Sequence, residues 1–384
     1  MRFEFATATR ILFGPGTIQE VGPLAADKGS SAFVVTGRTI ERAEPLLEEL
    51  NKHGIKYVTF NVPGEPTTII VKAGVEQARQ AKYDLVIGIG GGSTLDTGKV
   101  IAAMLTNSGE LEDYLEVVGR GKPLTQSPVP YIAIPTTAGT GAEVTCNAVI
   151  GLPEHQVKVS IRSPLMLPYL AVVDPVLTYS MPPSVTASTG LDALTQLMEV
   201  YVCNKANPLT DGICREGLKR AACSLRQAYE DGGNLAARED MAVASLFSGL
   251  ALANAKLGAV HGFAGPLGGM ISAPHGVICA KLLPYIMEAN VQALQRGAAG
   301  SPALGRYDEI AQLLTGAVTA QAVDGVIWVQ GLCAALKVPP LAEFGLNEQD
   351  FPAVVAKSRK SSSMKGNPIT LTDDELMEIL KKSR

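Results

Sequence analysis

The sequence lacks several features that define whole classes of protein. Its 384 residues carry a formal net charge of −4 and contain no block of basic residues, which argues against nucleic acids and anionic membrane surfaces as partners. No apolar run reaches membrane-spanning length, because Asn254 and Lys256 interrupt the longest one. The N-terminal stretch contains the acidic Glu4 and no continuous apolar segment, so it is not typical of a signal peptide.

Paired cysteines are also missing. The six cysteines are scattered without the spacing of a disulfide framework, at positions 146, 203, 214, 223, 279 and 333. This pattern is typical of a reducing compartment, and we therefore expect a cytoplasmic protein. With 46% hydrophobic and 18% charged residues, the chain is expected to be globular and well packed, and its length favours two domains.

The two halves of the chain differ in their hydrophobic sequence pattern. Short apolar, β-branched runs alternate with helical patterns in the first half; the runs cover 31–37, 56–62, 84–89, 130–137 and 168–175. Such alternation predicts a parallel sheet covered by helices on both faces. Beyond residue 183 the patterns are long, helical and rich in Ala and Leu. We therefore expect an α/β domain over 1–182 and an all-helical domain over 183–384.

Two glycine-bearing loops follow strands of the predicted sheet. GGGSTLDTGK (90–99) opens a helix, whose free N–H groups and flexible glycines suit a phosphate, and Ser93 can cap that helix or bond a phosphate oxygen. TTAGTGAEVT (136–145) follows a different strand. Ligands bind at the carboxyl ends of strands in open α/β sheets, so the two loops indicate one nucleotide cleft. A purely structural turn remains the alternative for each loop.

Histidine is scarce, and two of the four histidines lie in the apolar, glycine-rich stretch 257–276. In one unbroken helix, the rings of His261 and His275 would be roughly 21 Å apart. Our interpretation is that glycines and prolines break this helix and let the chain fold back; they are Gly265, Pro266, Gly268, Gly269 and Pro274. Pro274 also predicts a new helix that begins at His275.

A predicted apolar helix over 183–202 carries three polar residues on one face. Asp192, Gln196 and Glu199 stand at positions i, i+4 and i+7. A buried carboxylate needs a partner, and an Asp with two histidines is a donor set for a divalent metal with an open position. Core histidines bonded to the backbone remain the structural alternative.

In their order along the chain, these motifs resemble those of the iron-containing (group III) alcohol dehydrogenase family nearly from end to end. The matching stretches are FGPGTIQEVG, GGGSTLDTGK, PTTAGTGAEVT, VVDP, GLDALTQLMEVYV, GAVHGFAGPLGG, APHG and GNP. The resemblance implies a Rossmann-like N-terminal domain and a helical C-terminal domain, the dehydroquinate synthase-like fold. It also implies NAD(P)-dependent hydride transfer between a small alcohol and its aldehyde or ketone, with Fe²⁺ or Zn²⁺ polarising the substrate oxygen, in a homodimer or larger homo-oligomer.

The resemblance also implies roles for particular residues. The cofactor would contact Gly90, Gly91, Gly92, Ser93, Asp96, Lys99, Thr136, Thr137 and Thr140. The metal and the catalytic site would rest on Asp192, His261 and His275, with Gln196 at the family's fourth ligand position. Lys158 is a further candidate for the nicotinamide side of the cofactor.

Two departures from the family pattern bear on the cofactors. Gln196 stands where the family has a His, and its amide oxygen is a weaker donor for a borderline or soft metal. Gly37, followed by Arg38, stands where NAD-preferring members carry an Asp. Loss of that carboxylate removes repulsion against a 2′-phosphate, and the guanidinium can pair with one. We therefore expect NADP to be accepted as well as NAD.

Three other functions fit parts of the pattern. A metal-free keto-acid reductase resembling maleylacetate reductase is the nearest, although retention of Asp192 argues against it. A dehydroquinate synthase-like lyase would need a basic cluster for its substrate, and the region 192–275 has few Lys or Arg residues. A non-catalytic nucleotide-binding protein is the third alternative.

Overall fold

The computed structural model describes residues 2–155, 157–298 and 300–384, and it divides the chain into two compact units. The α/β unit comprises Ala6–Thr137 and Gly141–Ser180. The helical unit comprises Met181–Arg384, together with Ala138–Thr140 and the N-terminal segment up to Phe5. The main boundary between the two units therefore lies after Ser180, whereas the sequence predicted it after residue 182. Residues 138–140 form an excursion: they belong to the helical unit although they lie between two segments of the α/β unit, which the sequence did not predict.

The α/β unit is built on a parallel sheet of six strands. They are β1 (Arg10–Phe13), β2 (Ser31–Gly37), β3 (Lys56–Val62), β4 (Leu85–Gly90), β5 (Tyr131–Pro135) and β8 (Leu170–Val173). Their order across the sheet is β1-β8-β5-β4-β2-β3, and every neighbouring pair is parallel. The chain runs outward from β2 to β3 and then crosses back over β2 to reach β4, so the switch point of the topology lies between β2 and β4.

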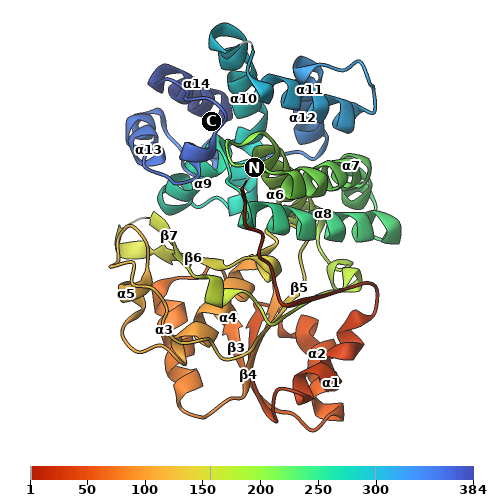
Figure 1. Cartoon of the computed structure of the whole chain (residues 1–384), viewed down its shortest axis with the longest axis vertical. Helices are drawn as coiled ribbons and strands as arrows, with labels where there is room; N and C mark the ends of the chain where they lie inside the picture. Colours follow the sequence, from red (N-terminus) through yellow and green to blue (C-terminus); the bar gives the residue numbers. More distant parts are fainter. Residues whose placement is uncertain (1, 156, 299) are drawn as a thin grey trace. The chain divides into compact units, whose positions relative to one another are not determined.

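Helices cover both faces of this sheet, as Figure 1 shows. Along β2, Ala32 and Val34 face α1 (Val21–Ala26) and α2 (Glu44–Lys52). The intervening Phe33 and Val35 pack with α3 (Thr68–Arg79) and α4 (Gly92–Met104) on the other face. Strands buried on both faces must be apolar throughout, which explains the continuous apolar runs in the sequence.

Two small elements complete the α/β unit. Along the chain, the short helix α5 (Leu111–Tyr114) precedes β5. An antiparallel hairpin of β6 (Asn147–Leu152) and β7 (Val157–Arg162) follows β5 and precedes β8. The sequence analysis did not predict this hairpin. Burial alternates along β6, and apolar and polar residues alternate along β7, so the period-2 signal of a strand was present in the sequence.

The helical unit contains no strand among its described residues. Its long helices are α6 (Pro183–Val202), α7 (Pro208–Glu230), α8 (Leu235–Ala253), α9 (Ala259–Met270), α10 (His275–Gly297), α11 (Pro302–Thr315), α12 (Ala322–Ala335), α13 (Phe351–Ser358) and α14 (Asp373–Ser383). Helix α6 packs against α7, α8 and α10, and every residue from 190 to 202 is buried. The predicted fold class, a parallel α/β sheet followed by helices, is confirmed.

The predicted break between the two histidines is wrong in its position. Helix α9 continues through Gly265 and Pro266 to Met270, and the chain turns only over residues 271–274. A proline removes one helical N–H bond, but burial of Phe263 and Leu267 on either side of Pro266 holds this helix in place. The new helix at His275 was predicted correctly. Within the described residues, no helix is long and apolar enough to cross a membrane.

A buried arginine ties the start of α6 to α8. Arg238 is 1% exposed, and its guanidinium donates to Thr186 Oγ1 at 2.8 Å, Gly232 O at 3.1 Å and Met181 O at 3.2 Å. Burial lowers the pKa of Arg238. The three acceptors share this one donor group, so its removal leaves buried oxygens without a donor.

We predict that Arg238→Met lowers the free energy of unfolding of the helical unit by about 2–4 kcal/mol, because breaking a buried charged network leaves its partners unpaired. The matched control is Arg226→Met, which removes an exposed i,i+4 pair with Glu230 and should change stability by less than about 0.5 kcal/mol. Urea unfolding followed by far-ultraviolet circular dichroism measures both. Equal effects of the two substitutions would show that the hydrogen bonds of Arg238 do not stabilise the helical unit.

Candidate functional site

Four potential metal ligands converge inside the helical unit. Asp192 comes from α6, His261 from α9, and His275 and Cys279 from the first turns of α10. One donor atom from each of the four lies within 4.8 Å of the donor atoms of the others. The centroids of the two imidazole rings are 5.4 Å apart, so the turn over 271–274 does bring the two histidines together.

The carboxylate of Asp192 is buried, and among the described residues only one of its two oxygens accepts a hydrogen bond. Its Oδ2 accepts a hydrogen bond from Gln196 Nε2 at 3.1 Å, whereas its Oδ1 has no hydrogen-bond partner in the described part of the chain. This Oδ1 lies 3.3 Å from His261 Nε2 and 3.7 Å from His275 Nε2. Burial alone would raise the pKa of Asp192, but the imidazoles of His275 and His261 outweigh it and hold the pKa below its ordinary value.

A second carboxylate orients His261. Glu199 Oε2 lies 2.6 Å from His261 Nδ1, and Glu199 Oε1 accepts the Val260 N–H at 2.6 Å. The His261 Nδ1–H therefore donates to Glu199, and Nε2 is the ring nitrogen that faces Asp192. Burial lowers the pKa of His261, but Cys279, Glu199 and Asp192 together raise it well above its ordinary value.

His275 and Cys279 share one face of α10, one turn apart. Cys279 Sγ lies 3.6 Å from His275 Nε2 and 3.8 Å from His261 Nε2. The Cys279 side chain is fully buried, whereas the His275 side chain is 33% exposed. The imidazole of His275 therefore marks the open side of the cluster.

The structure places Gln196 beside the cluster with its oxygen turned away. Gln196 Oε1 accepts from Ser248 Oγ at 2.8 Å, and the amide NH₂ group is the part that faces Asp192. An NH₂ group cannot ligate a cation. In this conformation the expected ligand role of Gln196 is replaced by a supporting one, in which Ser248 orients the amide and the amide orients Asp192.

The residues present fit a divalent metal. A buried carboxylate oxygen without a hydrogen bond is costly unless a cation or a donor fills the space beside it. The atoms around Asp192 Oδ1 are imidazole nitrogens and a thiol sulfur, which are ligands of borderline and soft divalent ions.

In the α/β unit, the predicted cofactor loops meet at the carboxyl edge of the sheet. Gly90 O accepts the Thr136 N–H at 2.9 Å, and a Cβ at Gly91 would lie 3.4 Å from Thr137. A Cβ at Gly90 would lie 2.5 Å from the Thr94 hydroxyl, so only glycine fits there. Gly92 and Ser93 then open α4, with their N–H groups at its N-terminus.

Two residues of the glycine-rich motif point into the protein instead. Lys99 is 1% exposed, and its ammonium donates to Asn147 O at 2.8 Å, Ala142 O at 2.9 Å and Thr145 Oγ1 at 3.0 Å. Asp96 Oδ2 accepts the Val149 N–H at 2.8 Å. The expected contact between Lys99 and the cofactor gains no support from this position, because these oxygens enclose the ammonium. Both side chains hold the hairpin and the residues before it.

The remaining predicted cofactor residues lie in different settings. Arg38 is exposed, and its Nε donates to Pro63 O at 3.0 Å. Lys158 lies on β7, and its ammonium pairs with Glu65 at 2.7 Å. Thr140 belongs to the excursion 138–140, which is part of the helical unit.

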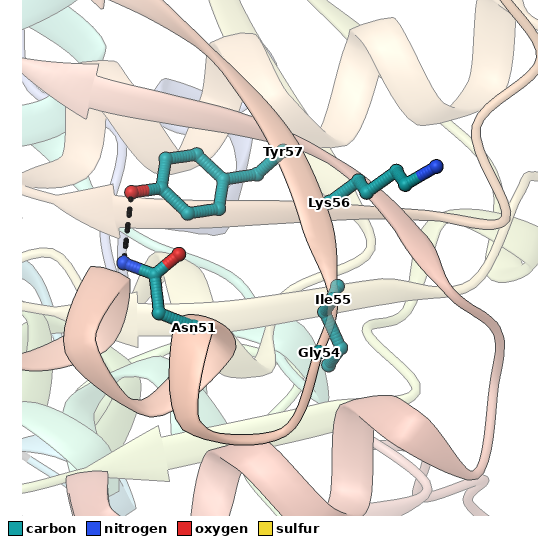
Figure 2. Close-up of a pocket in the computed structure, with 5 residues that line it drawn as sticks. All are labelled: Asn51, Gly54, Ile55, Lys56 and Tyr57. Atoms are coloured by element: carbon teal, nitrogen blue, oxygen red, sulfur yellow. Dashed lines mark hydrogen bonds between the residues drawn. The ribbon is translucent and has the colours of Figure 1, made fainter.

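A surface hollow of about 540 Å³ lies elsewhere on the α/β unit. Figure 2 shows its lining by Asn51, Gly54, Ile55, Lys56 and Tyr57, with Asn51 Nδ2 donating to Tyr57 OH at 3.3 Å. Lys56 begins β3, so the hollow is at the amino end of the sheet, opposite the edge where ligands bind in this architecture. We assign it no role.

Three residues of the cluster and its support were not assigned from the sequence. Cys279 stands four residues after His275, and this spacing on a helix would have indicated a shared face. Glu199 was placed on the face of Asp192 but received no role. Ser248 carried no signal, because a serine in an apolar helix is commonplace and its partner Gln196 is 52 positions away.

Known proteins resemble this chain over its full length. Residues 8–175 match the family model of iron-containing alcohol dehydrogenases, and residues 186–384 match the model of the C-terminal part of the same family. Alcohol dehydrogenase 4 of Saccharomyces cerevisiae is 35% identical over 379 residues, which cover 97% of this chain and 96% of the relative.

Solved structures give the same result. The crystal structure of a 1,3-propanediol oxidoreductase superposes with a TM-score of 0.92 at 33% identity and covers 100% of both chains. A sulfoacetaldehyde reductase from Bifidobacterium kashiwanohense, solved in complex with NAD⁺, superposes with a TM-score of 0.87 at 29% identity and covers 100% of this chain and 99% of its own. The resemblance seen in the motifs is therefore confirmed, and the chain belongs to the iron-containing alcohol dehydrogenase family.

Proposed function

We propose that this enzyme interconverts a small alcohol and its aldehyde or ketone, with a divalent metal held by Asp192, His261 and His275. The observation that carries the proposal is Asp192 Oδ1, a buried oxygen with no hydrogen bond among the described residues and with two imidazole nitrogens within 3.7 Å. A metal-free reductase leaves this oxygen unexplained, and the family match and the relatives favour neither the lyase nor the non-catalytic protein.

The bound groups would supply Lewis acidity at the substrate oxygen, from Fe²⁺ or Zn²⁺, and hydride transfer, from the nicotinamide. The chain's own residues prepare the site for them. Asp192 balances the positive charge, and Glu199 keeps the proton of His261 on Nδ1 so that Nε2 can act as a donor. Ser248 and Gln196 fix the second oxygen of Asp192, so the carboxylate cannot rotate freely.

The residues of the cofactor loop also fall into two groups, those that would contact the cofactor and those that support the loop. Gly90, Gly91, Gly92 and Ser93 would receive the pyrophosphate, because they combine close backbone approach with the N–H groups of the α4 terminus. Thr136 and Thr137 would line the same site from the neighbouring strand, and Thr140 would extend that line. Asp96 and Lys99 act as positioning residues beneath the loop.

At the adenosine end, NADP would bind as well as NAD. Gly37 presents no carboxylate beside β2, and the exposed guanidinium of Arg38 would pair with a 2′-phosphate. The Arg38 guanidinium donates through Nε to Pro63, which leaves its terminal nitrogens for a phosphate. A role for Lys158 toward the nicotinamide has no support beyond its position in the sequence.

Two broader features complete the proposal. All six cysteines are free thiols, which supports a reducing, cytoplasmic location. A homodimer or larger homo-oligomer is the assembly that the family resemblance implies, and light scattering would determine its size.

The first test concerns cofactor choice. A Cβ at Gly37 would lie 3.5 Å from the Thr94 hydroxyl, an ordinary contact, so Gly37→Asp should fold. We predict that it lowers kcat/KM for NADPH about tenfold or more relative to NADH, because a like charge then faces the 2′-phosphate. Gly37→Asn is the uncharged control of equal size and should change the ratio little. A wild-type enzyme that strongly prefers NADH would contradict the proposal.

The second test concerns the metal. Asp192→Asn removes the carboxylate charge with little change in size, so we predict loss of bound metal and a fall in aldehyde reduction of at least about 100-fold. Asp240→Asn is the control, because Asp240 pairs with Arg220 and Ser224 in the same unit. Elemental analysis and NAD(P)H oxidation, before and after chelation, measure both properties. Wild-type protein that is metal-free and fully active would refute the proposal.

A further inference from the structure

Cys279 is the member of the cluster that has no counterpart in our expectations from the sequence. We propose that its thiolate is the fourth protein ligand of the divalent metal, in place of Gln196, so that the donor set is Asp192, His261, His275 and Cys279. The inference rests on the metal site of the proposed function and adds to it the identity of one ligand and the class of metal.

The distances agree with a tetrahedral set of donors. Metal distances of about 2.0 Å for nitrogen and oxygen and about 2.3 Å for thiolate sulfur separate tetrahedral N and O donors by about 3.3 Å, and N and S donors by about 3.5 Å. The separations from Asp192 Oδ1 to the two Nε2 atoms are 3.3 and 3.7 Å. Cys279 Sγ lies 3.8 Å from His261 Nε2 and 3.6 Å from His275 Nε2.

Ordinary hydrogen bonding explains Cys279 poorly. A thiol has one proton, yet its sulfur lies at similar distances from two imidazole nitrogens. Of these, His261 Nε2 also faces the unbonded Asp192 Oδ1. When both Nε2 atoms are unprotonated, as metal ligation requires, a single thiol proton cannot satisfy these three acceptors, whereas one cation in their midst satisfies them all. On binding, the thiol loses its proton to solvent, as a coordinating cysteine does.

Gln196 is the competing fourth ligand, and its contacts disfavour it. Its oxygen accepts from Ser248, and its NH₂ group donates to Asp192. A rotation of the amide by 180° would place its oxygen against the ionised Oδ2 of Asp192 and would lose that donated bond. Cys279 needs no such rotation, because its sulfur already faces both imidazoles.

A thiolate also changes which metal the site selects. Thiolate sulfur favours thiophilic ions such as Zn²⁺ and Co²⁺, whereas oxygen-rich sites favour hard ions such as Mg²⁺ and Mn²⁺. We therefore expect the site to hold Zn²⁺ tightly, and four protein donors leave the substrate oxygen to enter as a fifth.

The test uses Co²⁺ as a spectroscopic probe of the metal-free full-length protein under anaerobic conditions. Wild-type protein should show a thiolate-to-cobalt charge-transfer band in the near ultraviolet. Cys279→Ala should lose this band and bind Zn²⁺ at least about 10-fold more weakly, as expected for loss of a ligand. Gln196→Ala should keep the band. Cys333→Ala is the control for a buried thiol of the same unit that lies outside the cluster.

A double variant separates ligand loss from damage to the fold. Cys279→Ala combined with Gln196→His supplies an imidazole at the family's fourth position, so it should recover Zn²⁺ affinity without the thiolate band. Circular dichroism identifies any variant that fails to fold, in which case Cys279→Ser replaces Cys279→Ala. A band and an affinity that survive in Cys279→Ala, or a band that is lost in Gln196→Ala while the metal still binds, would overturn the assignment and leave the metal site intact. Failure of wild-type protein to bind Co²⁺ or Zn²⁺ would refute the proposed function itself.

Discussion

The structure of the helical unit depends on one buried charge. Asp192 is 1% exposed in the middle of α6, a helix that is enclosed by its neighbours from residue 190 to its end. An isolated carboxylate in such a place would be strongly destabilising, so its surroundings must compensate for it. The compensation comes from three directions: the amide of Gln196 on the same helix, His261 from α9, and His275 from α10.

The path of the chain between α9 and α10 follows from this requirement. The turn over residues 271–274 allows the first residue of α10 to return toward α6. Gly276, next to His275, has its Cα so close to Ser188 that a Cβ there would lie 2.4 Å from the Ser188 carbonyl oxygen. Gly276 therefore allows close packing of α10 on α6, and this packing helps to set the position of the neighbouring His275 ring.

Sequence reasoning was most successful where one physical pattern dominates. Strands β2 and β3 were predicted with their observed bounds, because their β-branched and aromatic runs are flanked by clear turn signals. The candidate ligands Asp192, His261 and His275 stood out because polar residues are rare in apolar helices, and the structure places them in one cluster. The position of the helix break at Pro266 was wrong, because tertiary packing around Phe263 and Leu267 outweighs the local preference of proline.

Other features could not be predicted because they depend on contacts distant in sequence. The enclosure of Lys99 requires carbonyl groups from residues 142 and 147, more than 40 positions away, and a lysine in a phosphate-binding motif suggests the opposite orientation. The direction of the Gln196 amide depends on Ser248 of another helix. A cysteine in a run of apolar residues resembles any core residue until the fold places it beside two imidazoles.

The origin of the ligands on three separate helices has a consequence for the lifetime of the protein in a cell. A metal at this cluster would join α6, α9 and α10 as a cross-link, and metal binding would contribute directly to the free energy of folding. A newly made chain that has not acquired its ion keeps a buried oxygen without a partner and opens more readily at these helices. Proteases act on such openings, so metal supply would govern how long each copy survives as well as how many copies work.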